Sequence, residues 1–442
     1  MKRKDIVRIG CGAGFSGDRL EPSIVLLEQA GLDYLVLECL AERTIALAQK
    51  RKAANAAEGY DPLLEKRMKL YLPLLKKHQT KLITNMGAAN PVAAANKIIE
   101  IATTLGIKIK VAAITGDDVF DKISKDAPAL ETNEPLSKSG KIISANAYLG
   151  ADAILPALAT GADVIITGRV ADPSLFVAPL VHEFGWDMND AELIGQATVI
   201  GHLMECAGQI TGGYFADPVT KPVRDMAHLG HPFADVQMNG DACISKVDGT
   251  GGIINLATAK EQLLYEVVNP FEYYTPDVIA NFTTVQLKEI SKDNVFATGG
   301  TGKSKPQTLK VSVGYKAGFM GEAEILYAGS HALERAKLAG EILQERLKEN
   351  FSEMRIDHIG YNAAHRTNFG NVPAPYEART RVAAKAADAA TAAIIGEEVE
   401  ALYTNGPAGG GGVRKNVTEL IGILSVLIDR NHIQPSVTIF ES

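Results

Sequence analysis

Several charged or amide side chains come directly after short apolar runs in the first 172 residues of the chain. These side chains are Asp18, Arg19, Glu38, Asn85, Arg169 and Asp172. An arginine holds a carboxylate or a phosphate through its planar set of N–H donors. A carboxylate beside it acts as a general base or, when protonated, as a general acid. The combination predicts acid–base chemistry on an anionic substrate.

A polar stripe on a long apolar helix is the second candidate. Residues 190–208 are predicted to form this helix, and the stripe consists of Thr198, His202, Glu205 and Gln209, which recur at helical spacing. Such a stripe faces either water or a site. His202 with Glu205 would exchange protons or contribute to a metal site, although two ligands alone do not define one.

The positions of these side chains suggest a substrate-binding or proton-transfer role for each of them. We expect Arg19 and Arg169 to bind a carboxylate or a thioester oxygen, and Glu38 or Asp172 to act as the base. His202 and Glu205 would complete the proton transfer. Further substrate contacts are expected from Gly12, Gly14, Asp18, Asn85, Gly212, Gly213 and Tyr214.

Structural roles compete with these assignments. Glu38 ends a buried run, so an ion pair with Arg19 or Arg43 would also offset its desolvation. Asp172 precedes a proline, which is typical of a residue that caps a helix starting at Pro173. The polar stripe would equally suit an exposed helix face.

The stretch GAGFSG, Gly12–Gly17, matches the glycine pattern of a dinucleotide-binding loop, and Glu38 stands 21 residues after Gly17. In that loop the helix begins among the glycines, so that its N–H groups face the phosphates. Here residues 18–21 intervene, and Asp18 would repel phosphate. A tight turn that needs glycine is an equal explanation.

The first 170 residues alternate apolar runs with helical segments, which predicts parallel strands joined by helical crossovers. The expected strands are Ile6–Cys11, Tyr34–Glu38, Lys81–Thr84, Ile109–Ile114 and Val164–Thr167. We predict an α/β fold with a predominantly parallel sheet in residues 1–300 and a smaller α/β domain in residues 301–442. A partial or irregular α/β barrel is the alternative. In open parallel sheets, ligands bind beyond the carboxyl ends of the strands.

The composition excludes several classes of protein. Hydrophobic residues make up 46% of the 442 residues and charged residues 22%, as in ordinary globular proteins. The net charge is −7, and nucleic acid is not an expected partner because phosphate backbones require concentrated Lys and Arg. The four cysteines lack C-x-x-C spacing, which argues against a zinc ribbon. No apolar run is long enough to span a membrane or to form a signal peptide, so a cytoplasmic protein is expected.

Several long stretches, among them IGCGAGFSGDR, TGRVADPSL, GHLMECAGQITGGYFADP and GPAGGGG, resemble the acyclic terpene utilisation proteins of the AtuA-like type. The resemblance covers essentially the whole chain. It implies a role in the catabolism of branched carboxylic acids handled as CoA thioesters, and it implies no particular reaction. Many members carry a further small C-terminal domain, which we expect to be missing here or supplied as a separate subunit.

Residues and resemblance together favour an enzyme that acts on a carboxylic acid or acyl-CoA, a lyase or hydratase working beside a carbonyl. A non-catalytic subunit that binds an acyl group or a carboxylate for a partner enzyme is the alternative. An NAD(P)-binding oxidoreductase is the second alternative. We expect no redox cofactor, and the acidic residues are compatible with a divalent metal. A homo-oligomer is expected.

Overall fold

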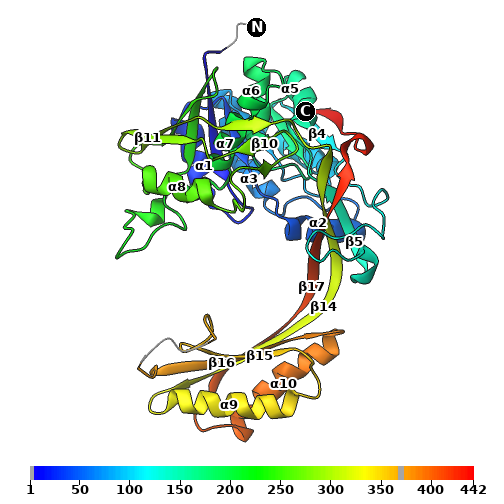
Figure 1. The fold of residues 1–442 in the computed structure, drawn as a ribbon, viewed down its shortest axis with the longest axis vertical. Coiled ribbons are helices and arrows are strands. Elements are labelled where there is room, and N and C mark those ends of the chain that lie inside the picture. The colour runs from blue at the N-terminus through cyan, green and yellow to red at the C-terminus, as the bar shows by residue number, and fades with distance from the viewer. Residues whose placement is uncertain (1–3, 367–372) are drawn as a thin grey trace. The chain divides into compact units, whose positions relative to one another are not determined.

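The computed structural model describes residues 4–366 and 373–442. The chain forms two compact units, each described below by itself (Figure 1). The first contains the residues up to 138, 142–314 and 423–442, and the second contains residues 139–141 and 315–422. Residues on both sides of position 300, where a boundary was expected, belong to the first unit, and so does the C-terminal segment. Within the described ranges, no helix is long and apolar enough to cross a membrane.

A mixed sheet runs through the first unit. Its strands, in order, are β11 (Gln286–Ser291), β12 (Asn294–Thr298), β8 (Ala242–Lys246), β7 (Pro232–Gln237), β1 (Ile6–Ala13), β2 (Tyr34–Leu37), β3 (Lys81–Thr84), β6 (Val164–Thr167), β4 (Lys110–Thr115) and β18 (Ser436–Glu441). The strands from β1 to β4 are parallel to one another, whereas the flanking strands pair antiparallel. The predicted α/β class with a parallel sheet is confirmed. The order runs from one edge strand to another, so the sheet is open and not a barrel.

Helices cover both faces of the parallel part. One face carries α1 (Glu21–Gln29), α3 (Leu64–His78) and α4 (Pro91–Thr104), and the other carries α5 (Ala151–Ala159), α6 (Ser174–Phe184) and α7 (Ala191–Glu205). Side chains of a strand alternate between the two faces. Leu35 therefore belongs to the core under α1, whereas Val36 belongs to the core under α6.

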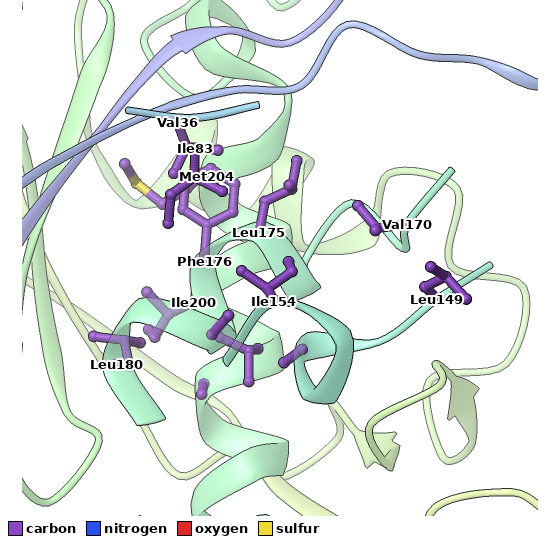
Figure 2. Close-up of a cluster of buried hydrophobic side chains, with 14 of the residues drawn as sticks. Val36, Ile83, Leu149, Ile154, Val170, Leu175, Phe176, Leu180, Ile200 and Met204 are labelled. Atoms are coloured by element: carbon purple, nitrogen blue, oxygen red, sulfur yellow. The ribbon is translucent and has the colours of Figure 1, made fainter. Parts of the chain in front are cut away.

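The core between the sheet and α6 is dense. Figure 2 shows Phe176 of α6 close to Met204 of α7 and to Val36 and Ile83 of the sheet. All four are at most 1% exposed. Full burial of such a side chain contributes about 1.5–3 kcal/mol, so this layer fixes α6 and α7 against the strands.

Local signals explain where the helices begin. The Asn90 side chain accepts a hydrogen bond from the N–H of Ala93 at the start of α4. Gly106, with a φ of +66°, follows the end of the same helix, where a left-handed backbone favours glycine. Asp190 caps α7 through the N–H of Leu193. Because α7 is fixed at its first turn, the positions of its polar side chains are fixed as well.

Shorter elements complete the first unit. They are α2 (Glu42–Ala54), β5 (Ile142–Ala147), α8 (Leu256–Leu264) and a small sheet of β13 (Thr301–Lys303), β10 (Ile279–Asn281) and β9 (Tyr273–Tyr274). Both β10 and β13 pack against α7. This small sheet covers the side of α7 that would otherwise be open to water.

The second unit is a sheet with helices on one face. Its strands, in order, are β15 (Met354–Ile359), β16 (Glu377–Ala386) and the parts of β14 (Thr308–Ala328) and β17 (Gly411–Asp429) that fall within residues 315–422; the remaining residues of these two long strands belong to the first unit. The helices α9 (Ala332–Leu347) and α10 (Ala389–Asn405) lie side by side against this sheet (Figure 1). A separate apolar core lies between the helices and the strands.

Candidate functional site

The structure brings four of the expected residues together at the carboxyl edge of the parallel strands. Glu38 follows β2, Asn85 follows β3, and Arg169 and Asp172 follow β6. The Nδ2 atom of Asn85 donates to Oε1 of Glu38 at 2.9 Å, and Arg169 forms an ion pair with Asp172. Leu40 links the two pairs, because its N–H donates to Oε1 of Glu38 at 2.8 Å and its carbonyl accepts from Arg169. We name Glu38, Asn85, Arg169 and Asp172 the strand-edge cluster.

Arg169 anchors this cluster. Its side chain is 1% exposed, and its guanidinium donates to the carbonyl oxygens of Leu40 and Val170 as well as to Asp172. The guanidinium carbon also lies 4.5 Å from the centre of the Tyr148 ring. Since all three of its nitrogens have protein partners, Arg169 positions Asp172 and is not an open clamp for a substrate.

The two carboxyl groups of the cluster differ in environment. Burial raises the pKa of Glu38 well above its usual range, and the nearby charge of Asp172 adds to the rise. Burial also raises the pKa of Asp172, but the charge of Arg169 opposes the shift. The Asp172 side chain is 37% exposed and so can reach a ligand. Burial therefore favours the protonated form of Glu38, whereas Arg169 favours the charged form of Asp172, as an acid and a base at one sheet edge require.

The competing structural roles of these two residues are not observed. Glu38 forms hydrogen bonds with Asn85 and Leu40 and no ion pair with an arginine among the described residues. The helix α6 begins at Ser174, and its first turn receives no cap from an acidic side chain.

His202 and Glu205 form a buried pair on α7. The Nδ1 atom of His202 lies 2.9 Å from Oε1 of Glu205, and its Nε2 atom lies 3.0 Å from the carbonyl oxygen of Gln262. His202 is 1% and Glu205 9% exposed, so the part of the polar stripe on α7 is covered, whereas Gln209 beyond the helix is half-buried. Burial raises the pKa of Glu205 to about 7, with His202 opposing the rise and the charge of Asp172 adding to it.

A pocket of about 480 Å³ opens at Asp172. Its walls include Glu42, Tyr148, Asp172, Glu266, Tyr273 and Lys310. The hydroxyl of Tyr148 donates to Glu42 at 2.6 Å, and Lys310 lies 3.3 Å from the same carboxylate. Burial opposes the ionisation of Glu42, but these partners outweigh it and lower its pKa to about 2. We name this cavity the Asp172 pocket.

A second pocket, of about 500 Å³, lies at the glycine-rich loop after β1. Five expected residues line it: Gly14, Asp18, Arg19, Gly213 and Tyr214. Asp18 accepts a hydrogen bond from the N–H of Gly14 at 2.6 Å. One Arg19 nitrogen donates to the carbonyl oxygens of Met226 and Ala227, at 3.0 and 2.8 Å. We name this cavity the first-loop pocket.

Gly12 and Gly212, which were expected to contact a substrate, are required as glycines by the local structure. A Cβ on Gly12 would lie 2.7 Å from a methyl carbon of Leu37 and 2.8 Å from Oγ of Ser23, so close packing requires glycine there. Gly212 has a φ of +104°, which glycine adopts without strain. Neither residue lines the first-loop pocket.

The first loop differs from a dinucleotide-binding loop at two points. The helix α1 begins at Glu21, beyond the glycines, so its free N–H groups do not belong to the loop. The Asp18 carboxylate also bonds the N–H of Gly14, which a phosphate oxygen would otherwise accept from. Both features argue against nucleotide binding.

Sequence reasoning left His231, Tyr148 and Lys310 out of the expected site. His231 lines the first-loop pocket because β7 pairs antiparallel with β1. Tyr148 and Lys310 meet through a backbone hydrogen bond between segments far apart in the chain. Local sequence patterns carry no signal for such pairings. Among residues 4–366 and 373–442, no group of three or more His, Cys, Asp or Glu side chains is placed to hold a metal ion.

These features define a mixed α/β protein with titratable side chains gathered beyond the carboxyl ends of its parallel strands. The family model of the acyclic terpene utilisation family protein AtuA matches residues 7–439, and the chain belongs to this family. Membership implies a role in acyclic terpene utilisation. Searches of curated proteins and of solved structures found no match.

Proposed function

We propose that the protein is an enzyme that moves protons beside the carbonyl of a carboxylic acid or its thioester, as a lyase or hydratase does. One observation carries the proposal: the buried Glu38 and the partly exposed Asp172, which pairs with Arg169, lie at one sheet edge, next to a pocket that Asp172 lines. A subunit that only binds an acyl group has no need of such a pair.

In the proposed dehydration, Asp172 takes a proton from the carbon next to the carbonyl. Glu38 does not line the Asp172 pocket, so its proton would reach the hydroxyl that leaves from the adjoining carbon through one bridging water. The C–H and C–O bonds break, a C=C double bond forms and water departs. Hydration is the same sequence reversed. Lys310 lines the pocket where the carbonyl oxygen becomes negative, and its ammonium group has N–H donors beyond the one directed at Glu42.

Proton exchange in D2O tests this proposal without knowledge of the full reaction. The protein is incubated with branched mono- and dicarboxylic acids and with their CoA thioesters, and deuterium at the carbon next to the carbonyl is measured by mass spectrometry. We expect exchange with at least one compound. Asp172→Asn should slow it by about 10²–10⁴-fold, the usual contribution of a positioned base.

Asp152→Asn is the matched control, because Asp152 is a half-exposed carboxylate outside the Asp172 pocket. Its exchange rate should equal that of the wild type. Binding without exchange in the wild type would favour the alternative, a subunit that holds the acid for a partner enzyme. Full exchange in Asp172→Asn would remove Asp172 from the mechanism.

A further inference from the structure

His231 is a chemically capable residue that the proposed acid–base pair does not use. It precedes β7, which pairs antiparallel with β1 so that Phe233 lies opposite Gly10. This register places the His231 ring beside Gly12, where Nδ1 lies 3.1 Å from the Gly12 carbonyl oxygen. A carbonyl oxygen only accepts hydrogen bonds, so Nδ1 carries a hydrogen.

The other ring nitrogen, Nε2, is left with a lone pair. His231 is 5% exposed, and its burial lowers its pKa; the charges of Arg67 and Arg19 act in the same direction, while Asp18 opposes them. A neutral ring with its hydrogen on Nδ1 has an acceptor at Nε2. Within the described residues, Nε2 forms no hydrogen bond.

Gly208 leaves that nitrogen uncovered. It belongs to the short helix Ala207–Gln209 after α7, and it lines the first-loop pocket together with His231. A Cβ on Gly208 would lie 3.4 Å from Nε2 of His231 and 3.0 Å from a methyl carbon of Leu229. A larger residue at this position would therefore cover the acceptor.

The rest of the first-loop pocket combines a cation with apolar walls. Arg19 uses one terminal nitrogen for Met226 and Ala227, and in the described part of the chain its other two side-chain nitrogens have no acceptor. Phe15 and Tyr214 line the pocket and are 60% and 86% exposed. These two rings present apolar surface on which the carbon chain of a ligand can pack.

The loop that carries Arg19 is held rigidly. Arg67, which is fully buried, donates to the carbonyl oxygens of Ser16 and Asp18 at 2.9 and 3.2 Å. The Asp18 carboxylate lies in the same pocket as Arg19. Its charge disfavours a purely anionic ligand and favours one that also presents a hydroxyl hydrogen.

We propose that the first-loop pocket binds a hydroxylated carboxylic acid or its ester. The ligand hydroxyl donates to Nε2 of His231, a carboxyl oxygen accepts from Arg19, and the carbon chain lies against Phe15 and Tyr214. This goes beyond the proposed function, because no residue of the strand-edge cluster lines the first-loop pocket. The result of the proton-exchange experiment at Asp172 therefore does not decide whether this binding proposal is correct.

Matched pairs of acids test the proposal. Isothermal titration calorimetry measures binding of straight and branched 3-hydroxy acids and of the same acids without the hydroxyl. A hydrogen bond to a neutral acceptor contributes about 0.5–1.5 kcal/mol, so we expect the best hydroxy acid to bind about 2- to 10-fold more tightly than its partner. Equal affinity within every pair, or no binding of any acid, would overturn the proposal.

Three variants test whether the preference for the hydroxy acid depends on Nε2 of His231. His231→Asn removes Nε2 and keeps an N–H near the position of Nδ1 for the Gly12 carbonyl, so the preference for the hydroxyl should vanish. His231→Gln places an amide oxygen near the position of Nε2 and should restore part of it. Gly208→Ala covers Nε2 and should weaken binding of the hydroxy acid with little effect on its partner.

His228→Asn is the control, because His228 lies three residues earlier with 80% of its side chain exposed. Its preference should match that of the wild type. A preference for the hydroxy acid that persists undiminished in His231→Asn would place the hydroxyl elsewhere and contradict the assignment.

Discussion

The Oε1 atom of Glu205 lies 2.9 Å from Nδ1 of His202. The hydrogen-bond partner of the other ring nitrogen determines how many protons the His202–Glu205 pair holds. The Nε2 atom of His202 faces the Gln262 carbonyl, which only accepts, so Nε2 carries a hydrogen. The short contact between Nδ1 and Oε1 then requires one more hydrogen, on the ring or on the carboxyl group. In either case the buried pair is neutral overall, as burial demands.

This proton makes stability depend on pH. The pKa of Glu205 rises from 4.5 to about 7 in the folded protein, so the folded state binds the proton more tightly than the unfolded state does. The associated stability is fully present below pH 4.5 and is lost as the pH rises through 7. The shift corresponds to about 3 kcal/mol.

Glu205→Gln cannot titrate and keeps an N–H that donates to Nδ1 of the neutral ring. Its free energy of unfolding, relative to that of the wild type, should therefore rise by up to about 3 kcal/mol between pH 4.5 and pH 8. Urea denaturation at several pH values measures this, with Glu345→Gln on an exposed helix position as the control. Parallel pH profiles for Glu205→Gln and the wild type would contradict the assignment of the proton.

Local patterns predicted the parallel part of the sheet well. The expected strand Lys81–Thr84 matches β3, and Ile6–Cys11 falls short of β1 by two residues. Short apolar runs determine these elements locally. The antiparallel strands β7 and β18 join the same sheet from distant parts of the chain, and no local period encodes such a partner.

The candidate site was predictable to the same extent. Glu38 and Asn85 follow adjacent parallel strands, so their contact follows from topology alone. The sequence could not show that Leu40 links them to Arg169 through its backbone. It also could not decide whether the polar stripe of α7 faces water or a site, because the small sheet that covers the helix comes from residues 273–303.

Arg169 and Arg19 should differ sharply in their contribution to stability. Arg169→Met leaves the partly exposed Asp172 and the buried Leu40 carbonyl without their partner, and an unpaired buried acceptor alone costs about 1–3 kcal/mol. Arg19→Met removes an exposed side chain with two bonds to backbone carbonyls and should cost no more than about 1 kcal/mol. Urea denaturation of both variants measures the difference. Similar losses would mean that Arg169 does not anchor the cluster.

Two glycines of the first loop should respond differently to alanine. A Cβ on Gly14 would lie 2.5 Å from the carbonyl carbon of Cys206, a backbone atom that cannot move aside. A Cβ on Gly17 would meet the ring of Phe15, an exposed side chain that can rotate. We expect Gly14→Ala to cost about 1–3 kcal/mol and Gly17→Ala less than about 0.5 kcal/mol. Thermal unfolding of both variants measures these losses of stability. An equal loss for the two variants would show that the Cys206 backbone moves aside, and would contradict the prediction.

The first loop should not bind a dinucleotide. Asp18 already accepts from the N–H of Gly14, and α1 begins only at Glu21, so neither the loop nor the helix offers its N–H groups to a pyrophosphate. NAD, NADP and ATP should therefore leave the unfolding temperature unchanged.

The size of the expected effect makes this test decisive. A ligand at one hundred times its dissociation constant stabilises the folded state by about 2.7 kcal/mol, which a thermal scan resolves. Asp18→Asn serves as the comparison, because it removes the charge that repels phosphate while an amide oxygen can still accept from Gly14. A shift with NAD in the wild type that Asp18→Asn enhances would identify a dinucleotide loop and favour an oxidoreductase.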